Sequence, residues 1–156
     1  MARTSRDLPT SDELAAWREH VETFEIVRAR IAAQLQRDSG LSAGDYKVLL
    51  ALSESEGRTL RSSRLASLIE WERSRLSAQL GRMERRGLVR REPCAEDARG
   101  SNVVLTDAGA DAFRASTIPH LRAIKELFVD AFTPTQLAVL RDASAAMRTH
   151  LEATSR

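Results

Sequence analysis

The middle of the chain limits the choice of fold more than any other part. Two short helical stretches, residues 61–69 and 73–86, are separated by only a few residues. Two strand-like stretches, 88–91 and 102–105, follow on either side of a polar loop, 92–101, that contains proline and glycine. A short helix pair followed by two strands around a basic loop predicts a winged helix-turn-helix.

The helix pair also satisfies the packing rules of a helix-turn-helix. Ala66 is the small residue expected where the helices cross, and Leu76 is the apolar contact expected from the second helix. Glu70 stands in the turn, where a left-handed backbone favours glycine and costs another residue on the order of 1 kcal/mol. Leu80 and Met83 extend the buried stripe of the second helix at about 100° per residue.

The opposite face of this second helix has the composition expected of a helix that enters the major groove. Small residues there allow close approach, and arginine pairs with guanine O6 and N7. A solvated helix face is the alternative, which alanine and glycine on that face disfavour. The face carries Ser74, Ala78, Gly81, Arg82 and Arg85, flanked by Arg75 and Ser77.

Basic charge is concentrated in the same region. Residues 58–100 contain eleven arginines and six acidic residues, which gives this segment a net charge of +5. Since the whole chain has a net charge of +2, the remaining residues together carry a net charge of −3. A basic block within an acidic chain is typical of a module that faces nucleic acid. An arginine-rich surface of another kind would carry the same charge, so charge alone does not decide.

Helices are predicted on both sides of the middle segment. Residues 10–38 form a long helix that begins at a capping box of Thr10 and Glu13 and carries a near-heptad apolar stripe. Thr106 caps a helix after the strands, and Thr133 begins the last one. These stripes exceed what a small winged helix needs, so we expect a twofold homodimer through the terminal helices rather than helices folded back on their own domain.

The predicted class is therefore mainly α, a winged helix-turn-helix lobe with N- and C-terminal helices that form a dimerisation lobe. We expect residues 1–9 to be a disordered tail, and residues 10–40 and 107–153 to form the helical dimerisation region. Residues 41–106 form the expected winged helix-turn-helix region.

Composition excludes several classes of protein. With 42% hydrophobic and 29% charged residues, the chain is expected to be globular and cytoplasmic. No apolar run approaches the roughly 20 residues that span a bilayer, and residues 1–9 are too polar for a secretory signal. Cys94, the single cysteine, follows Pro93, and nearby arginines could lower its pKa, but we interpret it as a chance exposed thiol.

The sequence contains no pattern of a catalytic, metal or cofactor site. Its three histidines are scattered, and no Ser-His-Asp arrangement, P-loop or dinucleotide-binding glycine pattern is present. No cluster of histidine, cysteine and carboxylates has metal spacing. We therefore expect neither an enzyme nor a cofactor.

Two runs resemble the MarR (multiple antibiotic resistance regulator) family. Residues 73–77 followed by 83–91 are similar to its recognition helix and first wing strand. Residues 97–100 followed by 103–109 are similar to its wing signature, D-x-R followed by V-x-L-T-x-x-G, and the likeness spans about residues 10–153. The resemblance implies a dimeric DNA-binding regulator in which an aspartate orients the wing arginine.

The wing chemistry can also be argued from the residues. Arg99 is expected at a glycine-flanked loop tip, from which its guanidinium can enter a narrow minor groove of negative potential. Asp97, two residues away, can orient that group through a hydrogen bond. An exposed ion pair worth under about 1 kcal/mol is the alternative. The expected DNA contacts are Ser62, Ser63, Arg73, Ser74, Arg75, Ser77, Ala78, Arg82, Asp97 and Arg99.

Many MarR proteins bind small aromatic acids in a cleft beside the dimer helices. The resemblance and the aromatic residues of the first two helices suggest five ligand-binding candidates, Trp17, Arg18, His20, Phe24 and Tyr46, with Arg18 pairing a carboxylate. A structural role in the core is equally compatible with the aromatic rings.

The expected function is a regulator of transcription that binds a pseudo-palindromic operator in double-stranded DNA. It is expected to be a repressor that a small aromatic or anionic effector releases from the DNA. An effector-independent DNA-binding protein and a winged-helix protein-interaction module are the alternatives.

Overall fold

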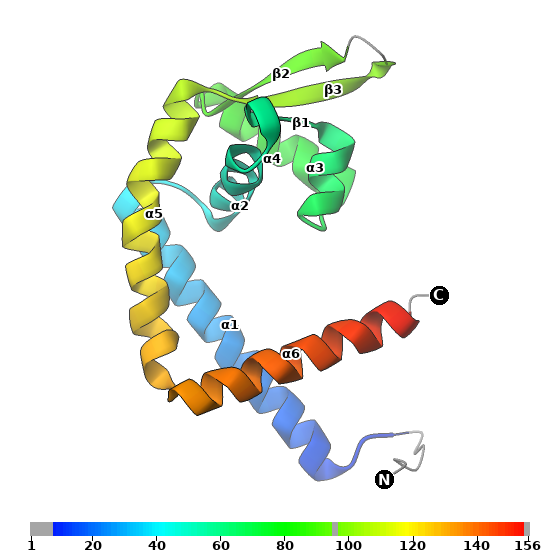
Figure 1. Cartoon of the computed structure of the whole chain (residues 1–156), viewed down its shortest axis with the longest axis vertical. Coiled ribbons are helices and arrows are strands. Elements are labelled where there is room, and N and C mark those ends of the chain that lie inside the picture. Colours follow the sequence, from blue (N-terminus) through cyan, green and yellow to red (C-terminus); the bar gives the residue numbers. More distant parts are fainter. Residues whose placement is uncertain (1–7, 95–96, 155–156) are drawn as a thin grey trace. The chain divides into compact units, whose positions relative to one another are not determined.

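The computed structural model describes residues 8–94 and 97–154, and for residues 94 and 97–100 it describes the backbone alone. It confirms the mainly α winged helix-turn-helix class, with one small antiparallel sheet among helices (Figure 1). In chain order the elements are α1 (Ser11–Ser39), α2 (Ala43–Ser53), the 3-10 helix η1 (Glu56–Arg58), β1 (Thr59–Arg61), α3 (Ser62–Leu68), α4 (Arg73–Arg85), β2 (Val89–Cys94), β3 (Asp97–Leu105), α5 (Asp107–Leu127), the 3-10 helix η2 (Val129–Ala131) and α6 (Pro134–Thr154).

The chain divides into two compact units. A central unit comprises residues 32–124, and a terminal unit comprises residues 1–31 together with 125–156. The long helices α1 and α5 contribute residues to both units. The assignment of dimerisation to the terminal helices stays a prediction.

The central unit contains the hydrophobic core. Its sheet has the order β1-β3-β2, and β3 therefore pairs on both sides. Leu60 of β1 lies opposite Val103, and Val89 of β2 lies opposite Leu105. The buried side chains come from the end of α1, from α2, α3 and α4, from the sheet and from α5. Gly109, in the first turn of α5, packs so closely on the sheet that a Cβ there would overlap the backbone carbonyl of Leu88.

The hairpin of β2 and β3 is longer than predicted, and the expectation of a loop over residues 92–101 was wrong. Pairing continues through Pro93 opposite Ser101, with a register shift between Pro93 and Cys94. β2 is an edge strand, in which a proline can be accommodated although it lacks an N–H, so Pro93 did not end the strand. Arg99 consequently lies within β3 rather than at a loop tip, and its side chain and that of Asp97 are outside the described residues.

Helix starts were predicted well because their signals are local. The Thr10 N–H donates to the Glu13 carboxylate at 2.8 Å, and the Glu13 N–H donates to Thr10 Oγ1 at 3.2 Å, which confirms the capping box. Thr106 Oγ1 accepts from the N–H of Gly109 at 3.0 Å at the start of α5. α5 continues through Pro119 and ends at Leu127.

The terminal unit has no comparable core. Among the described residues, every buried hydrophobic side chain lies between Leu35 and Ala123, within the central unit. Large apolar side chains of α1 and α6 are exposed, among them Trp17, with 60% of its surface accessible, and Met147, with 56%. Within the described ranges, no helix combines the length and apolar character needed to cross a membrane.

Candidate nucleic-acid interface

The turn between α3 and α4 has the geometry of a helix-turn-helix. Glu70 has a φ of 54°, which confirms the left-handed backbone expected there. The Trp71 N–H reaches back to the carbonyl of Ala66 at 2.9 Å and closes the turn. Ala66 and Leu76 are both buried, as expected of a small residue at the crossing and an apolar residue facing it. The hydrogen bond from Trp71 and the burial of Ala66 and Leu76 define the turn, and they hold Glu70 in a strained conformation although it is not a glycine.

The two faces of α4 differ as predicted. Leu76, Leu80 and Met83 are almost completely buried in the core. The opposite face is exposed, except that Gly81 is partly buried. A Cβ at Gly81 would meet only the tip of the Arg85 side chain, at 4.0 Å, so no packing contact within the chain requires a glycine there. The outer face of α4 therefore has a flat, open patch beside its arginines.

A buried carboxylate holds α4 against α2. Asp45 is only 2% exposed, and its Oδ1 accepts from Nε2 of Gln79 on α4 at 2.6 Å. Its Oδ2 accepts from Nη1 of Arg86 at 2.7 Å and from the N–H of Ser42 at 2.9 Å. The amide oxygen of Gln79 in turn accepts a hydrogen bond from Arg82. One carboxylate thus links the start of α2 to an arginine on the outer face of α4.

The charge of Asp45 is stabilised by its surroundings. Burial alone would raise the pKa of the carboxyl, but the hydrogen bonds from the Ser42 backbone and from Arg86, together with the Arg86 charge, outweigh it. The pKa of Asp45 therefore lies below its ordinary value of 3.8. At neutral pH the group is an ionised acceptor, as the bonds from Arg86 and Gln79 require.

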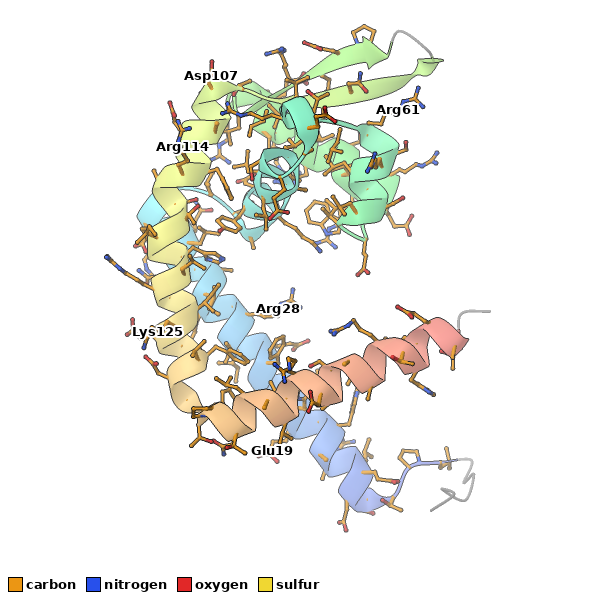
Figure 2. All side chains as sticks on the ribbon, viewed as in Figure 1. Glu19, Arg28, Arg61, Asp107, Arg114 and Lys125 are labelled. Atoms are coloured by element: carbon orange, nitrogen blue, oxygen red, sulfur yellow. The ribbon has the colours of Figure 1, made fainter. Side chains whose placement is uncertain are left out.

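Two further ion pairs link elements of the central unit. Glu84 of α4 accepts from the N–H of Arg91 at 3.0 Å and from its Nη2 at 2.7 Å, and these bonds lower the pKa of the Glu84 carboxyl. Arg58 of η1 lies 3.5 Å from Asp107, which Figure 2 shows at the start of α5. Both pairs are exposed enough that each stabilises the fold only modestly. The Arg91–Glu84 pair links β2 to α4, and the Arg58–Asp107 pair links η1 to α5.

Comparison with known proteins decides the family. A MarR family model matches residues 39–100. AbsC, a MarR family transcriptional regulator from Streptomyces coelicolor, is 38% identical, with a TM-score of 0.85 over 96% of this chain and 99% of its own. The chain belongs to the MarR family of transcriptional regulators. Sco3205, another MarR family regulator from Streptomyces coelicolor, solved in complex with DNA, is 35% identical, with a TM-score of 0.86 over 94% of this chain and 92% of its own. No curated protein matches the chain.

In this MarR family member, most of the expected DNA contacts lie together around α4. Arg73, Ser74 and Arg75 occupy its first turn, all exposed. Ser62 and Ser63 begin α3, immediately after Arg61, which Figure 2 labels where β1 passes into α3. Ser77, Ala78 and Arg82 are also exposed on α4. Their role in DNA binding remains a prediction, as does that of Asp97 and Arg99.

The five ligand-binding candidates do not all fall in one unit. His20 and Phe24 stack with ring centroids 5.9 Å apart and line an apolar cavity of about 450 Å³ in the terminal unit, together with Phe128 and Phe132. Trp17 and Arg18 belong to the same unit but are not among the residues lining this cavity. Tyr46 lies in the central unit, where it packs on Phe113 and His120.

Three residues of the interface were not singled out for this role from sequence. They are Asp45, Gln79 and Trp71. Gln79 borders the apolar stripe of α4, one residue before Leu80, and its position there could have suggested a buried polar partner. Over the described residues, no group of three or more histidine, cysteine, aspartate or glutamate side chains could hold a metal ion.

Proposed function

We propose that this protein is a homodimeric transcriptional regulator that binds a specific pseudo-palindromic operator in double-stranded DNA and represses transcription until a small aromatic or anionic effector releases it. As a regulator of chromosomal genes it would act in the cytoplasm. The observation that carries the proposal is the outer face of α4, where exposed arginines and serines surround small residues.

This face suits DNA better than a protein partner. Arg73, Arg75 and Arg85 extend from a helix of which the opposite side is anchored in the core. No hydrogen bond or ion pair to another described residue engages these three guanidinium groups, so their donors are available for phosphates or base edges. A protein-binding helix face would be expected to present larger apolar side chains. The likeness to Sco3205, solved with DNA, supports the same conclusion.

Dimerisation is supported by the terminal unit. Its helices carry exposed apolar side chains, and its described residues include none that is buried in the single chain. Exposed apolar surface of this extent favours association, and a second copy supplies a matching surface through twofold symmetry. A twofold dimer would place two α4 helices on a duplex about one helical turn apart.

The effector is supported by the cavity beside His20 and Phe24. A cavity of this size lined mainly by apolar and aromatic groups suits a small aromatic molecule, and a histidine offers a donor for an acid group. Benzoate is a suitable probe. If it neither raises the melting temperature of the protein nor weakens DNA binding, an effector of this class is refuted and the effector-independent alternative is favoured.

The proposal is tested by selecting duplexes from a random-sequence library on the immobilised protein. We expect an inverted repeat with half-sites about one helical turn apart, bound with an affinity that falls steeply as salt is raised. Sedimentation at micromolar concentration should give twice the chain mass. Failure to enrich any sequence would contradict the proposal and favour the protein-interaction alternative.

A further inference from the structure

Trp71 occupies an unusual place at the entrance to α4. It lies in the helix-turn-helix turn, immediately before Glu72, the N-cap of α4. Its half-buried side chain packs against the hydrophobic core. A Cβ at Gly44 of α2 would lie 3.0 Å from the indole Cη2, closer than side chains normally pack. The indole therefore fills space that α2 leaves by having no side chain at that position.

The outward side of this fixed indole carries an arginine. The guanidinium carbon of Arg75, one helical turn after Trp71, lies over the indole ring at 4.2 Å from its centroid. This distance is well within the range of a cation–π interaction. Because Trp71 is held by the turn and by the core, the interaction restricts an otherwise long and mobile side chain at the first turn of α4.

The kind of contact determines what Arg75 can still bind. A guanidinium donates hydrogen bonds from its edge, so a contact over an aromatic ring leaves those donors available. The structure gives the Arg75 guanidinium no hydrogen bond or ion pair with any described residue. By contrast, Arg86 and Arg91 are bound to the carboxylates of Asp45 and Glu84. Arg75 is thus held by a group that neither occupies its donors nor neutralises its charge.

We propose that Trp71 is a positioning residue for DNA recognition, which holds the Arg75 guanidinium so that its edge pairs with two acceptors on one base in the major groove. The inference rests on the proposed function, since it requires a DNA partner for α4. The first turn of a recognition helix is where side chains reach base edges, and a paired acceptor matches the two parallel N–H groups of a guanidinium. A phosphate contact would need the charge but not this orientation.

The test compares two substitutions of Trp71 on two duplexes, one enriched by the wild-type protein and one of the same length and unrelated sequence. Trp71→Leu removes the aromatic face and should weaken binding to the enriched duplex about threefold to fivefold, with little change on the unrelated duplex. Trp71→Phe retains a smaller aromatic face and should restore part of the loss. Phe113→Leu, which also replaces a half-buried aromatic ring packed against the core of the central unit, is the matched control and should alter neither affinity.

A double-mutant cycle with Arg75→Ala separates positioning from a general effect on the fold. If Trp71 acts through Arg75, Trp71→Leu should add little once Arg75 is alanine. Trp71 fluorescence in a Trp17→Phe background should change on Arg75→Ala, because the cation over the ring is lost. Circular dichroism and sedimentation establish that each variant is folded and assembled like the wild type. Should Trp71→Leu not fold, Trp71→Phe is decisive, with an expected loss of about twofold that Arg75→Ala abolishes.

The outcomes separate this inference from the proposed function. If the wild type enriches a duplex but the losses of Trp71 and Arg75 variants add, Trp71 does not position Arg75 and the inference is overturned alone. Equal losses on both duplexes would overturn it as well, because they indicate a phosphate contact without sequence preference. If the wild type enriches no duplex, the proposed function fails and the inference fails with it.

Discussion

Substitution of Asp45 should reveal how much the buried carboxylate contributes to the fold. Asp45→Ala removes the acceptor of Gln79, of Arg86 and of the Ser42 N–H. The Gln79 amide, itself 7% exposed, would keep an unsatisfied buried donor, which costs about 1–3 kcal/mol. Loss of the reciprocal helix cap adds about 0.5–1 kcal/mol. Arg86 is 43% exposed and regains water, so its loss is small, and we expect the variant to be destabilised by roughly 2–4 kcal/mol.

The assay is urea unfolding followed by circular dichroism, at one protein concentration because the stability of the proposed dimer would depend on concentration. Asp111→Ala is the matched control, since Asp111 also pairs with an arginine, Arg114, but both side chains are about two-thirds exposed. The control should lose no more than about 0.5 kcal/mol. If Asp45→Ala loses no more than Asp111→Ala, the carboxylate does not hold α4 on α2 and the reasoning is wrong.

The pH dependence of the same variant provides a second check. The pKa of Asp45 is lower in the folded chain than its ordinary value of 3.8, so its contribution is complete above that value. As the pH falls through the lowered pKa, folded Asp45 takes up a proton and the contribution disappears. The stability difference between wild type and Asp45→Ala should therefore be constant near neutral pH and shrink in acid below 3.8.

Three further predictions concern other parts of the structure. Gly81→Ala should raise the free energy of unfolding by about 0.5–1 kcal/mol, because the added methyl group meets open space, yet weaken binding to the enriched duplex if α4 lies close to the bases. Arg99→Ala should weaken operator binding by on the order of 1.5–3 kcal/mol with the fold intact, and Asp97→Ala should weaken it less. A double-mutant cycle measured by fluorescence anisotropy tests the link between the two residues. If the two losses of binding free energy simply add, Asp97 does not orient Arg99. Burial lowers the pKa of His120, and Nδ1 of this residue has no hydrogen-bond partner among the described residues. As the pH falls, the unfolded chain therefore takes up a proton before the folded chain does. The free energy of unfolding should consequently fall as the pH drops below about 6.5. His120→Leu should flatten that part of the unfolding profile, and an unchanged slope would contradict this account.

How far the sequence predicted the structure depended on the distance over which each signal acts. The capping box of Thr10 and Glu13 spans three residues, and the buried stripe of α4 repeats within one helix, so both were visible in the printed sequence. The bond from Gln79 to Asp45 joins residues 34 positions apart, and no local pattern relates them. Its prediction would have required the packing of α4 on α2 beforehand.

The hairpin shows a different limit. Pro93 and Gly100 are normally turn signals, and they predicted a loop where the chain continues as paired strands. The effect of a proline depends on whether its strand lies at the edge of a sheet, and the sheet order is a property of the whole central unit. A local rule therefore placed Arg99 at a loop tip, whereas the structure places it within β3, at the register shift of the hairpin.

The arginines of residues 58–100 illustrate why counting charges could indicate the function but not the site. Arg86 and Arg91 bind carboxylates from α2 and α4, and so stabilise the arrangement of the elements. Arg75 lies over an indole that leaves its charge and donors available. A count of charges treats these three arginines alike, but the fold places a different group beside each guanidinium. Arginines that are neutralised within the protein should release few counterions from DNA, so the salt dependence of binding should reflect arginines such as Arg75, which carries no ion pair to a described residue, rather than the full basic block.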